Sequence, residues 1–412
     1  GISRKDRRER KKRGPAIVSV NRVPLLLDHA EFPRYSDWVT SRERLLAVLR
    51  GQIPDRVPFA PNIWQWFEYH KLHGSLPDEL QGCDSHLGAS RVLGVDIFSR
   101  NLATDIQMRW FGSHALPTYR ETEVVETLEA DRRHLIYRTS EGTLSEVLEF
   151  QREGCTLVQL EYLFKDFDKE KAAWRALYED LQLSFDWESF HRLSRAVGDA
   201  GIVIAGEITS PLKQLHLCAR ADQTTFLLVD HEIEMMDLMA VYAEKALGLI
   251  EEMAKGGVRV IMSMDNLDST FYPPPYFERY CSEFYSKAAE LCHRHGSYLF
   301  SHACGNQRSI LPQVVQCGID GLEGIAFPPL GDIDLWNARE AGESFVVVGG
   351  LSAVELEGPV TRQASEEYVK KLFHRMRPLE RFIFSMSCNT SIRTRWDTLR
   401  YYRDAWMKYG SA

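Results

Sequence analysis

The strongest constraint on the fold is a regular alternation of helix-like and strand-like segments from residue 169 to the last residues of the sequence. Short apolar runs, such as 202–206 and 258–262, follow longer amphipathic segments. Apolar strands that are separated by helices indicate a parallel sheet covered on both faces. Two earlier strand-like runs, 57–60 and 95–98, complete a set of β/α units that predicts an α/β fold, a (β/α)8 TIM barrel.

Two parts of the chain depart from this alternation. Residues 117–151 consist of short segments of alternating polarity, which predict an antiparallel β-meander inserted into the barrel. The first residues are rich in Lys and Arg, and we interpret 1–37 as a basic N-terminal extension, either solvated or docked on an acidic partner or a neighbouring subunit. We predict a single TIM-barrel domain over 38–412, whose first helix opens with a capping box at 40–43.

Charge and cysteine usage narrow the partners and the location that we expect. The net charge is −8, and without the basic extension the body is more acidic still, which argues against nucleic acid as a partner. No run approaches the roughly 18 consecutive apolar residues of a membrane helix, and no secretory signal pattern opens the chain. The 8 cysteines lack the spacing of a disulfide framework, which is typical of reduced thiols in the cytoplasm.

The most informative motif is His302-Ala303-Cys304, which follows the apolar run 298–300. Side chains two residues apart at a strand end project to the same side, so this imidazole and thiol could bind one ion. Cys388 follows a second strand-like run, 381–386, and could reach the same end of the barrel. One nitrogen and two sulfurs suit Zn²⁺ and leave a coordination position for substrate. The alternative is a histidine and two cysteines packed as ordinary buried side chains.

Polar residues recur at the ends of the predicted strands, where TIM barrels have their active sites. They include Asn62, Glu207, Asp265, Asn266, His302, Cys304, Glu323, Cys388 and Asn389. Such side chains are costly to bury unless they are paired or bound to a metal. We predict His302, Cys304 and Cys388 as metal ligands, and Asn62, Asn266 and Asn389 as substrate contacts.

The three carboxylates of this set have separate predicted roles. Glu207 or Asp265 is expected to act as a fourth ligand or as a general acid/base toward a substrate oxygen. Glu323 is expected to orient His302 through the second ring nitrogen. For each carboxylate, a salt bridge at the barrel mouth is an equally good interpretation.

Aromatic residues flank the same loops, among them Trp64, Trp66 and Tyr272. Aromatic side chains most often pack in a core, and that alternative stays open for these three. They occur beside Pro61 and the proline run 273–275, in contexts typical of loops. We therefore predict that they line a pocket for a flat ligand and contact the substrate.

The segment 288–306, which includes His302-Ala303-Cys304, resembles the uroporphyrinogen decarboxylase superfamily, and within it the branch of cobalamin (corrinoid)-dependent methyltransferases. The segments 41–46 and 55–58 are similar to the N-terminal signature of that family. The resemblance extends from about residue 38 to the end of the sequence. It implies a TIM barrel in which His302, Cys304 and Cys388 bind a catalytic zinc.

For function, the resemblance implies methyl transfer between a small substrate and the cobalt of a corrinoid. The corrinoid is expected on a partner protein, because no Asp-x-His-x-x-Gly corrinoid-binding segment is present. The preferred substrate is a methoxylated aromatic that undergoes O-demethylation, and a thiol or tetrahydrofolate acceptor is the alternative.

Other readings of the family resemblance remain. A uroporphyrinogen-decarboxylase-like lyase is disfavoured, because no Arg-rich porphyrinogen-binding motif lies between Val57 and His70. A non-enzymatic scaffold for a corrinoid protein is a further alternative, and a homodimer is left open.

Overall fold

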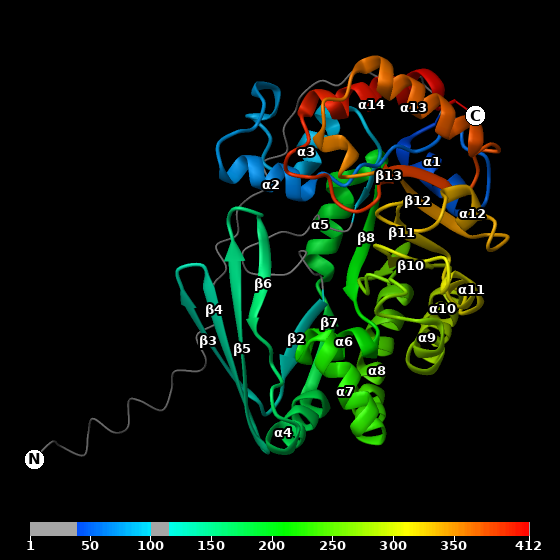
Figure 1. The fold of residues 1–412 in the computed structure, drawn as a ribbon. Helices are drawn as coiled ribbons and strands as arrows, with labels where there is room; N and C mark the ends of the chain where they lie inside the picture. The colour runs from blue at the N-terminus through cyan, green and yellow to red at the C-terminus, as the bar shows by residue number, and fades with distance from the viewer. Residues whose placement is uncertain (1–38, 100–114, 412) are drawn as a thin grey trace, which may run out of the picture. The chain divides into compact units, whose positions relative to one another are not determined.

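The computed structural model describes residues 39–99 and 115–411, apart from the side chains of Gly206 and Glu207, so the predicted extension 1–37 lies outside the described residues. All described residues belong to one compact unit. Its centre is a curled parallel sheet with the strand order β1-β8-β9-β10-β11-β12-β13 (Figure 1). The strands are β1 Ile97–Ser99, β8 Gly201–Ile208, β9 Val260–Ser263, β10 Tyr298–His302, β11 Gly321–Ile325, β12 Val346–Leu351 and β13 Phe382–Met386.

The predicted first strand, 57–60, closes the ring between β13 and β1. It forms a single parallel bridge rather than a strand of its own, at Phe59 and Phe384. On one side, Phe384 N–H donates to Pro58 O and Ala60 N–H donates to Phe384 O, both at 2.9 Å. On the other side, Asp96 N–H donates to Phe59 O at 2.8 Å. The seven strands and this segment therefore form the closed barrel that the sequence predicts.

The strand side chains divide into an inner and an outer set. Alternate residues of neighbouring strands, such as Val260, Met262 and Val348, form one buried cluster with Leu45 and Val48 of the first helix. The intervening residues of the same strands pack in a larger cluster with the surrounding helices. This period of two is what a sheet covered on both faces requires. The inner cluster fills the barrel, and the first helix covers one of its ends.

The helices of the barrel lie outside the strands (Figure 1). They are α1 Ser41–Leu49, α3 His86–Leu93, α5 Trp187–Val197, α8 Glu232–Lys255, α10 Ser282–Arg294, α11 Leu311–Gln316, α12 Leu335–Arg339, α13 Arg362–Arg375 and α14 Trp396–Tyr409. The predicted capping box is present, with Thr40 as N-cap and Glu43 returning a hydrogen bond to it. Gly296 follows α10 with φ of +71°, the left-handed conformation that ends helices. None of the described helices is both long and apolar enough to span a bilayer.

Several helices differ from the prediction. The helix predicted over 276–293 is divided into α9 Pro274–Tyr280 and α10, with a break at Cys281. Helices α2 Trp64–Leu72, α6 Pro211–Ala219 and α7 Ala221–Asp230 lie in segments where the sequence pattern predicts no separate helix. All three occupy connections after strand ends, where amphipathic periodicity is short and therefore hard to distinguish from a loop.

The insertion is a four-stranded antiparallel sheet that is longer than predicted. Its strands are β3 Glu123–Glu129, β4 Arg132–Thr139, β5 Gly142–Gln151 and β6 Thr156–Glu161, and β6 lies beyond the predicted boundary at residue 151. The predicted strand at 118–120 does not join this sheet. It belongs to β2 Ala115–Tyr119, which pairs with β7 Leu181–Phe185. The prediction of a helix from Phe185 is wrong at its start, because Asp186 caps α5 and leaves Phe185 in the strand. Helix α4 Phe167–Asp180 joins the two sheets.

Candidate metal centre

His302, Cys304 and Cys388 meet at one end of the barrel, as their positions after strand ends predict. His302 is the last residue of β10, Cys304 follows it by two residues, and Cys388 follows β13 by two residues. One ligand atom from each residue lies within 4.8 Å of the other two. His302 is buried, whereas both cysteines are partly exposed. The cluster is therefore anchored in the barrel and accessible from its C-terminal face.

The geometry of the cluster fits a tetrahedral metal ion. The distance from His302 Nε2 is 3.0 Å to Cys304 Sγ and 3.8 Å to Cys388 Sγ. Zinc–sulfur and zinc–nitrogen bonds of about 2.3 Å and 2.1 Å place two ligands of a tetrahedron roughly 3.6 Å apart. The three donors therefore lie within small adjustments of the spacing that zinc requires. A three-residue donor set of this kind is typical of catalytic zinc, because a fourth position remains for substrate.

Glu323 lies on the neighbouring strand β11 and fixes the orientation of the His302 ring. The two residues are aligned partners in the parallel sheet, and His302 Nδ1 is hydrogen-bonded to Glu323 Oε2. A proton on Nδ1 leaves Nε2 with a free lone pair that faces the two sulfurs. The approach of β11 depends on Gly324, whose φ is +105° and where a Cβ would lie 2.3 Å from Ala303 O. The contact predicted between Glu323 and His302 is present.

Asp265 follows β9, the strand beside β10, and its side chain is buried and hydrogen-bonded within the protein. Its side chain is fully buried, and Oδ1 accepts a hydrogen bond of 2.8 Å from Ser210 N–H. Oδ2 has no hydrogen-bond partner among the described residues. Burial raises the pKa of Asp265, against the hydrogen bond from Ser210. Burial therefore favours the protonated form of this carboxyl, which is the form that a general acid needs.

For Glu207 and Asn266, the structure gives less information about the predicted roles. Glu207 belongs to strand β8, but its side chain lies outside the described residues. Asn266 is exposed and has a positive φ of 53°, in the loop after β9. Asparagine tolerates this conformation better than most residues. Both roles, in catalysis for Glu207 and in substrate binding for Asn266, stay predictions.

Asn62, Trp64 and Asn389 form a hydrogen-bonded group beside Cys388. Asn389 Oδ1 accepts from both Asn62 Nδ2 and Trp64 Nε1, each at 2.8 Å. Asn389 Nδ2 in turn donates to Gln65 Oε1 at 3.3 Å. The structure therefore brings three of the predicted substrate contacts together next to a predicted metal ligand. Their hydrogen bonds also fix the loop that contains Cys388.

Trp66 and Tyr272 lie apart from this group and are buried, Trp66 in the wall of a separate pocket and Tyr272 in the packed interior. Trp66 is on helix α2, not in a loop as the sequence indicates, and its indole donates to Thr394 O at 2.8 Å. Tyr272 is 1% exposed, and its hydroxyl donates to Asp265 O at 3.2 Å. Both aromatic rings therefore contribute to packing in this structure, the alternative that the sequence left open. Their predicted contact with substrate stays untested.

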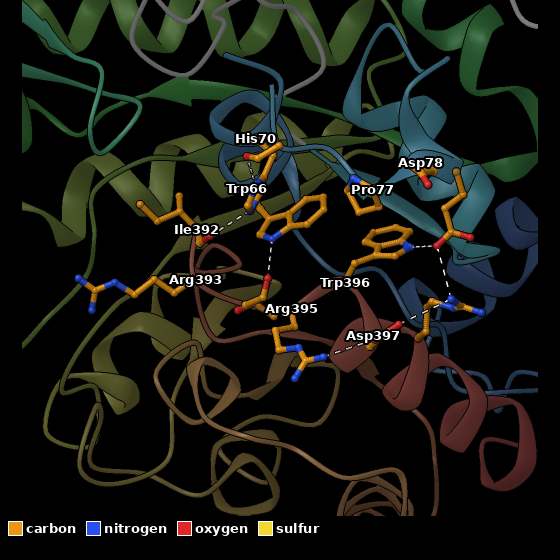
Figure 2. Close-up of a pocket in the computed structure, with 13 residues that line it drawn as sticks. Trp66, His70, Pro77, Asp78, Ile392, Arg393, Arg395, Trp396 and Asp397 are labelled. Atoms are coloured by element: carbon orange, nitrogen blue, oxygen red, sulfur yellow. Dashed lines mark hydrogen bonds and ion pairs between the residues drawn. The ribbon is translucent and has the colours of Figure 1, made fainter. Parts of the chain in front are cut away.

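A pocket of ≈ 580 Å³ lies between α2 and the segment that leads into α14 (Figure 2). Trp66 and Trp396 stack there with ring centroids 5.3 Å apart. His70 Nε2 is hydrogen-bonded to Ile392 O at 3.0 Å. None of the three predicted metal ligands lines this pocket. It is a separate hollow that shares with the metal centre only the loop after β13.

One residue near the centre is missing from the sequence-based set. Lys213 lies in the first turn of α6, directly after the loop that follows β8. Burial lowers its pKa, whereas the charges of Asp265 and Cys304 raise it. The signal in the sequence is Ser210-Pro211, an N-cap followed by proline in the first turn, immediately after an apolar strand.

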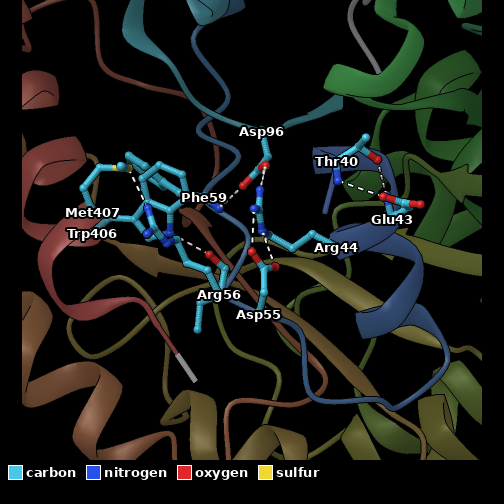
Figure 3. Close-up of polar contacts among 10 residues, drawn as sticks. Thr40, Glu43, Arg44, Asp55, Arg56, Phe59, Asp96, Trp406 and Met407 are labelled. Atoms are coloured by element: carbon cyan, nitrogen blue, oxygen red, sulfur yellow. Dashed lines mark hydrogen bonds and ion pairs between the residues drawn. The ribbon is translucent and has the colours of Figure 1, made fainter. Parts of the chain in front are cut away.

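A second buried polar cluster lies at the opposite end of the barrel, where the strands begin (Figure 3). Asp96 directly precedes β1, and its carboxylate accepts from Arg44 Nη1 at 2.6 Å and from Phe59 N–H at 2.9 Å. Arg44 also donates twice to Asp55, at 2.9 Å each. Burial lowers the pKa of Arg44, but the bonds and charges of Asp55 and Asp96 outweigh burial and raise it. Both carboxylates are thus paired with the guanidinium.

The fold and the cluster together define a class: a (β/α)8-type barrel with one histidine and two cysteines gathered where the strands end. Residues 162–409, more than half of the chain, match the family profile described as uroporphyrinogen decarboxylase (URO-D). The chain therefore belongs to the uroporphyrinogen decarboxylase family, a family of enzymes, as the motifs of the sequence indicate. No curated protein has a sequence that matches this chain.

Solved structures support the fold assignment. A methyltransferase from Methanosarcina mazei is similar with a TM-score of 0.58 and 14% identity, over 90% of this chain and 99% of that one. A Listeria monocytogenes protein described as a vitamin-B12 independent methionine synthase has a TM-score of 0.41 and 14% identity, over 86% of this chain and 96% of that one. At these identities the first similarity shows a shared fold, and the second is too weak to support an argument.

Proposed function

We propose that this protein is a zinc-dependent methyltransferase that moves a methyl group between a small substrate and the cobalt of a corrinoid bound to a partner protein. The observation that supports it most is the gathering of His302, Cys304 and Cys388 within 4.8 Å at the C-terminal end of the barrel. The family assignment and the fold shared with a methyltransferase agree with it.

The residues of the centre have distinct tasks in this proposal. His302 Nε2 and the sulfurs of Cys304 and Cys388 hold the zinc, and Glu323 keeps the proton of His302 on Nδ1. When bound, the zinc supplies Lewis acidity to the heteroatom that gains or loses the methyl group. Asp265, buried and with a raised pKa, is placed to hold a proton for a substrate oxygen.

The preferred substrate is a methoxylated aromatic that is demethylated at oxygen. Trp64 supports this choice by its position, because its indole is bonded to Asn389 beside Cys388, although the residue itself is only 4% exposed. Phe271, which is 53% exposed, lies in the loop after β9 at the same end of the barrel. Trp66 and Tyr272 add little support, since both are buried away from this group. The corrinoid supplies the cobalt that receives the methyl group, and it arrives with the partner.

The proposal is tested by metal analysis and by a methyl-transfer assay. Purified protein is expected to retain about one zinc per chain after dialysis, because two thiolates and an imidazole bind zinc tightly. With a corrinoid protein and a panel of methoxyarenes, thiols and folates, methylation of reduced cobalt changes the corrinoid spectrum and identifies the donor. Cys304→Ala is expected to lose both zinc and transfer.

Cys83→Ala is the matched control, because Cys83 is also a partly exposed cysteine outside any disulfide and lies outside the cluster. It is expected to retain zinc and transfer at the level of the unaltered protein. Zinc-free protein with full activity, or a Cys304→Ala variant as active as the control, would contradict a metal-dependent mechanism. Transfer from thiols or folates, with none from any methoxyarene, would exclude the preferred substrate class.

A further inference from the structure

Lys213 is a cation that the proposed reaction has not yet used. It lies in the first turn of α6, and its backbone N–H donates to Ser210 Oγ at 3.2 Å, so the N-cap fixes its position. Helix α6 begins immediately after the connection from β8, on the face of the barrel where the strands end. Lys213 therefore lies on the same face as the predicted metal ligands.

A chain of hydrogen bonds joins the start of α6 to the metal centre across neighbouring strands. Ser210 N–H donates to Asp265 Oδ1 at 2.8 Å. The loop that contains Asp265 is bonded onward, because Leu267 N–H donates to His302 O at 3.1 Å. Strands β8, β9 and β10 are adjacent in the sheet. The position of Lys213 relative to His302 is thus set by rigid elements and not by a free loop.

The ammonium group of Lys213 has no carboxylate within ion-pair distance among the described residues. Lysines on the outside of the protein, such as Lys255 and Lys287, are paired with a glutamate one helical turn away. Lys213 is partly buried instead, and burial lowers its pKa, while the charges of Asp265 and Cys304 act in the opposite direction. A partly buried cation without a partner is unfavourable in an empty site.

Metal binding would leave the positive charge of Lys213 still less compensated. The two thiolates of Cys304 and Cys388 neutralise a divalent ion, so Cys304 no longer offers Lys213 a negative charge. The remaining neighbour, Asp265, is a carboxyl whose burial favours the neutral form. The surroundings of Lys213 are then positive and, among the described residues, contain no counterion. A ligand with one negative charge would remove the imbalance, and a single ammonium suits a carboxylate.

We propose that Lys213 binds a carboxylate of the substrate, so that the methoxylated aromatic is an acid, such as a methoxybenzoate, and not a neutral ether. This inference rests on the proposed function, which makes the metal centre the place where the substrate binds. It adds a residue that determines specificity, and it excludes neutral methoxyarenes as the favoured substrates.

The test compares the binding of two compounds of the same shape, 4-methoxybenzoate and 4-methoxybenzamide, by isothermal titration calorimetry. The unaltered protein is expected to bind the acid about 10-fold more tightly or better, because a charge-assisted hydrogen bond replaces a neutral contact. Lys213→Met, which retains the length of the side chain, is expected to bind both compounds within about 2-fold of each other. Lys213→Arg is expected to keep a preference for the acid.

Lys287→Met serves as the control, since Lys287 lies on the outer face of α10 and is paired with Glu283. It is expected to match the unaltered protein, and zinc content, measured for every variant, is expected to be unchanged. Equal binding of acid and amide by the unaltered protein, a preference that survives in Lys213→Met, or no detectable binding of the acid would each overturn the inference.

Binding needs no methyl transfer, so the inference and the proposed function can fail separately. If the acid binds through Lys213 but no methyl group reaches the corrinoid, the proposed reaction is wrong and the anion site stands. If neutral methoxyarenes are demethylated equally well by the unaltered protein and by Lys213→Met, the reaction stands and the role of Lys213 is wrong.

Discussion

The two ends of the barrel contain partly buried polar clusters that differ in how completely their groups are paired. Where the strands begin, Arg44 is bonded to Asp96 and Asp55, and Asp96 also accepts from a backbone amide. Where the strands end, His302 is oriented by Glu323 while its other nitrogen faces two sulfurs. The first cluster satisfies its own charges, and the second presents donors that converge on one point.

This difference separates a stabilising role from a chemical one. In TIM barrels, polar groups at the beginnings of the strands generally support stability, and those at the ends of the strands perform chemistry. A closed network such as that of Arg44 is costly to break, yet it has nothing left to offer a ligand. The open cluster is expected to be nearly dispensable for folding and indispensable for function. Substitutions where the strands begin should therefore lower stability and leave zinc affinity unchanged. Substitutions where the strands end should lower zinc affinity and leave stability nearly unchanged.

The largest effect is expected from Cys388→Ser. Zinc affinity is expected to fall by at least about 100-fold, because even the loss of a group that only orients a ligand costs about 10–100-fold. The free energy of unfolding of the metal-free protein is expected to change by less than about 1 kcal/mol, since Cys388 is partly exposed. Zinc content after dialysis and urea unfolding of the metal-free form are the measurements. Unchanged zinc content in Cys388→Ser would contradict a separate, metal-binding role for the cluster where the strands end.

The reverse pattern is expected from Asp96→Ala. It leaves the partly buried Arg44 with one partner fewer, which should cost about 3–5 kcal/mol of unfolding free energy, while zinc affinity stays constant. Asp131→Ala is the control, because the Asp131–Arg152 pair lies in the insertion and is screened by solvent, so its loss should change the unfolding free energy far less. Urea unfolding at neutral pH measures both. Equal losses in the two variants would contradict a special role for the paired cluster.

A smaller effect on the metal is expected from Glu323→Gln. The amide preserves the shape but is a weaker acceptor for the His302 proton, so zinc affinity should fall about 10–100-fold. Competition with a chromophoric chelator measures this loss. Glu43→Gln, at the capping box of α1, is the control that should leave zinc affinity unchanged. A Glu323→Gln variant with unaltered affinity would show that the contact does not tune the ligand.

The smallest effect concerns His86, which belongs to neither cluster. It is buried without a partner for either ring nitrogen among the described residues, and burial lowers its pKa to about 4. The unfolded chain binds a proton at this histidine below about pH 6.5, whereas the folded protein binds it only near pH 4. Stability is therefore lost as the pH falls from about 6.5 to about 4, by about 2 kcal/mol between pH 7 and pH 5.

His86→Leu is expected to remove this part of the pH dependence, and the exposed His374→Leu is expected to preserve it. Thermal unfolding at a series of pH values compares the three proteins. Parallel curves for the unaltered protein and His86→Leu would mean that His86 does not contribute to the loss.

The sequence predicts the gathering of His302, Cys304 and Cys388 well because it follows from two simple rules. His302 and Cys304 are two residues apart at a strand end, and Cys388 follows a parallel strand whose end lies at the same edge. Neither rule depends on how side chains pack. The contact between Glu323 and His302 follows in the same way from the adjacency of β10 and β11.

The aromatic residues and Lys213 were harder to place for physical reasons. Trp64 and Trp66 are two positions apart on a helix, so their rings point in different directions, one toward Asn389 and the other toward Thr394. Read as a loop, the same spacing predicts that both rings line one pocket, whereas in the structure the two indoles donate to different segments. Lys213 lies in a helix within a connection, and the absence of a carboxylate partner among the described residues depends on tertiary contacts that no local pattern contains.

The closure of the barrel through residues 58–60 makes zinc retention a measure of ring integrity. Cys388 follows β13, whose free edge is held by the backbone bonds of that short segment and by side-chain bonds beside them, such as Ser385 Oγ to Ala60 O at 2.7 Å. His302, the last residue of β10, and Cys304, two residues later, do not depend on this seam. Loosening it, for example by Ala60→Pro, which removes the N–H bonded to Phe384, would leave a two-ligand half-site. Slow release of the ion could thus report opening of the cylinder before any global unfolding signal changes.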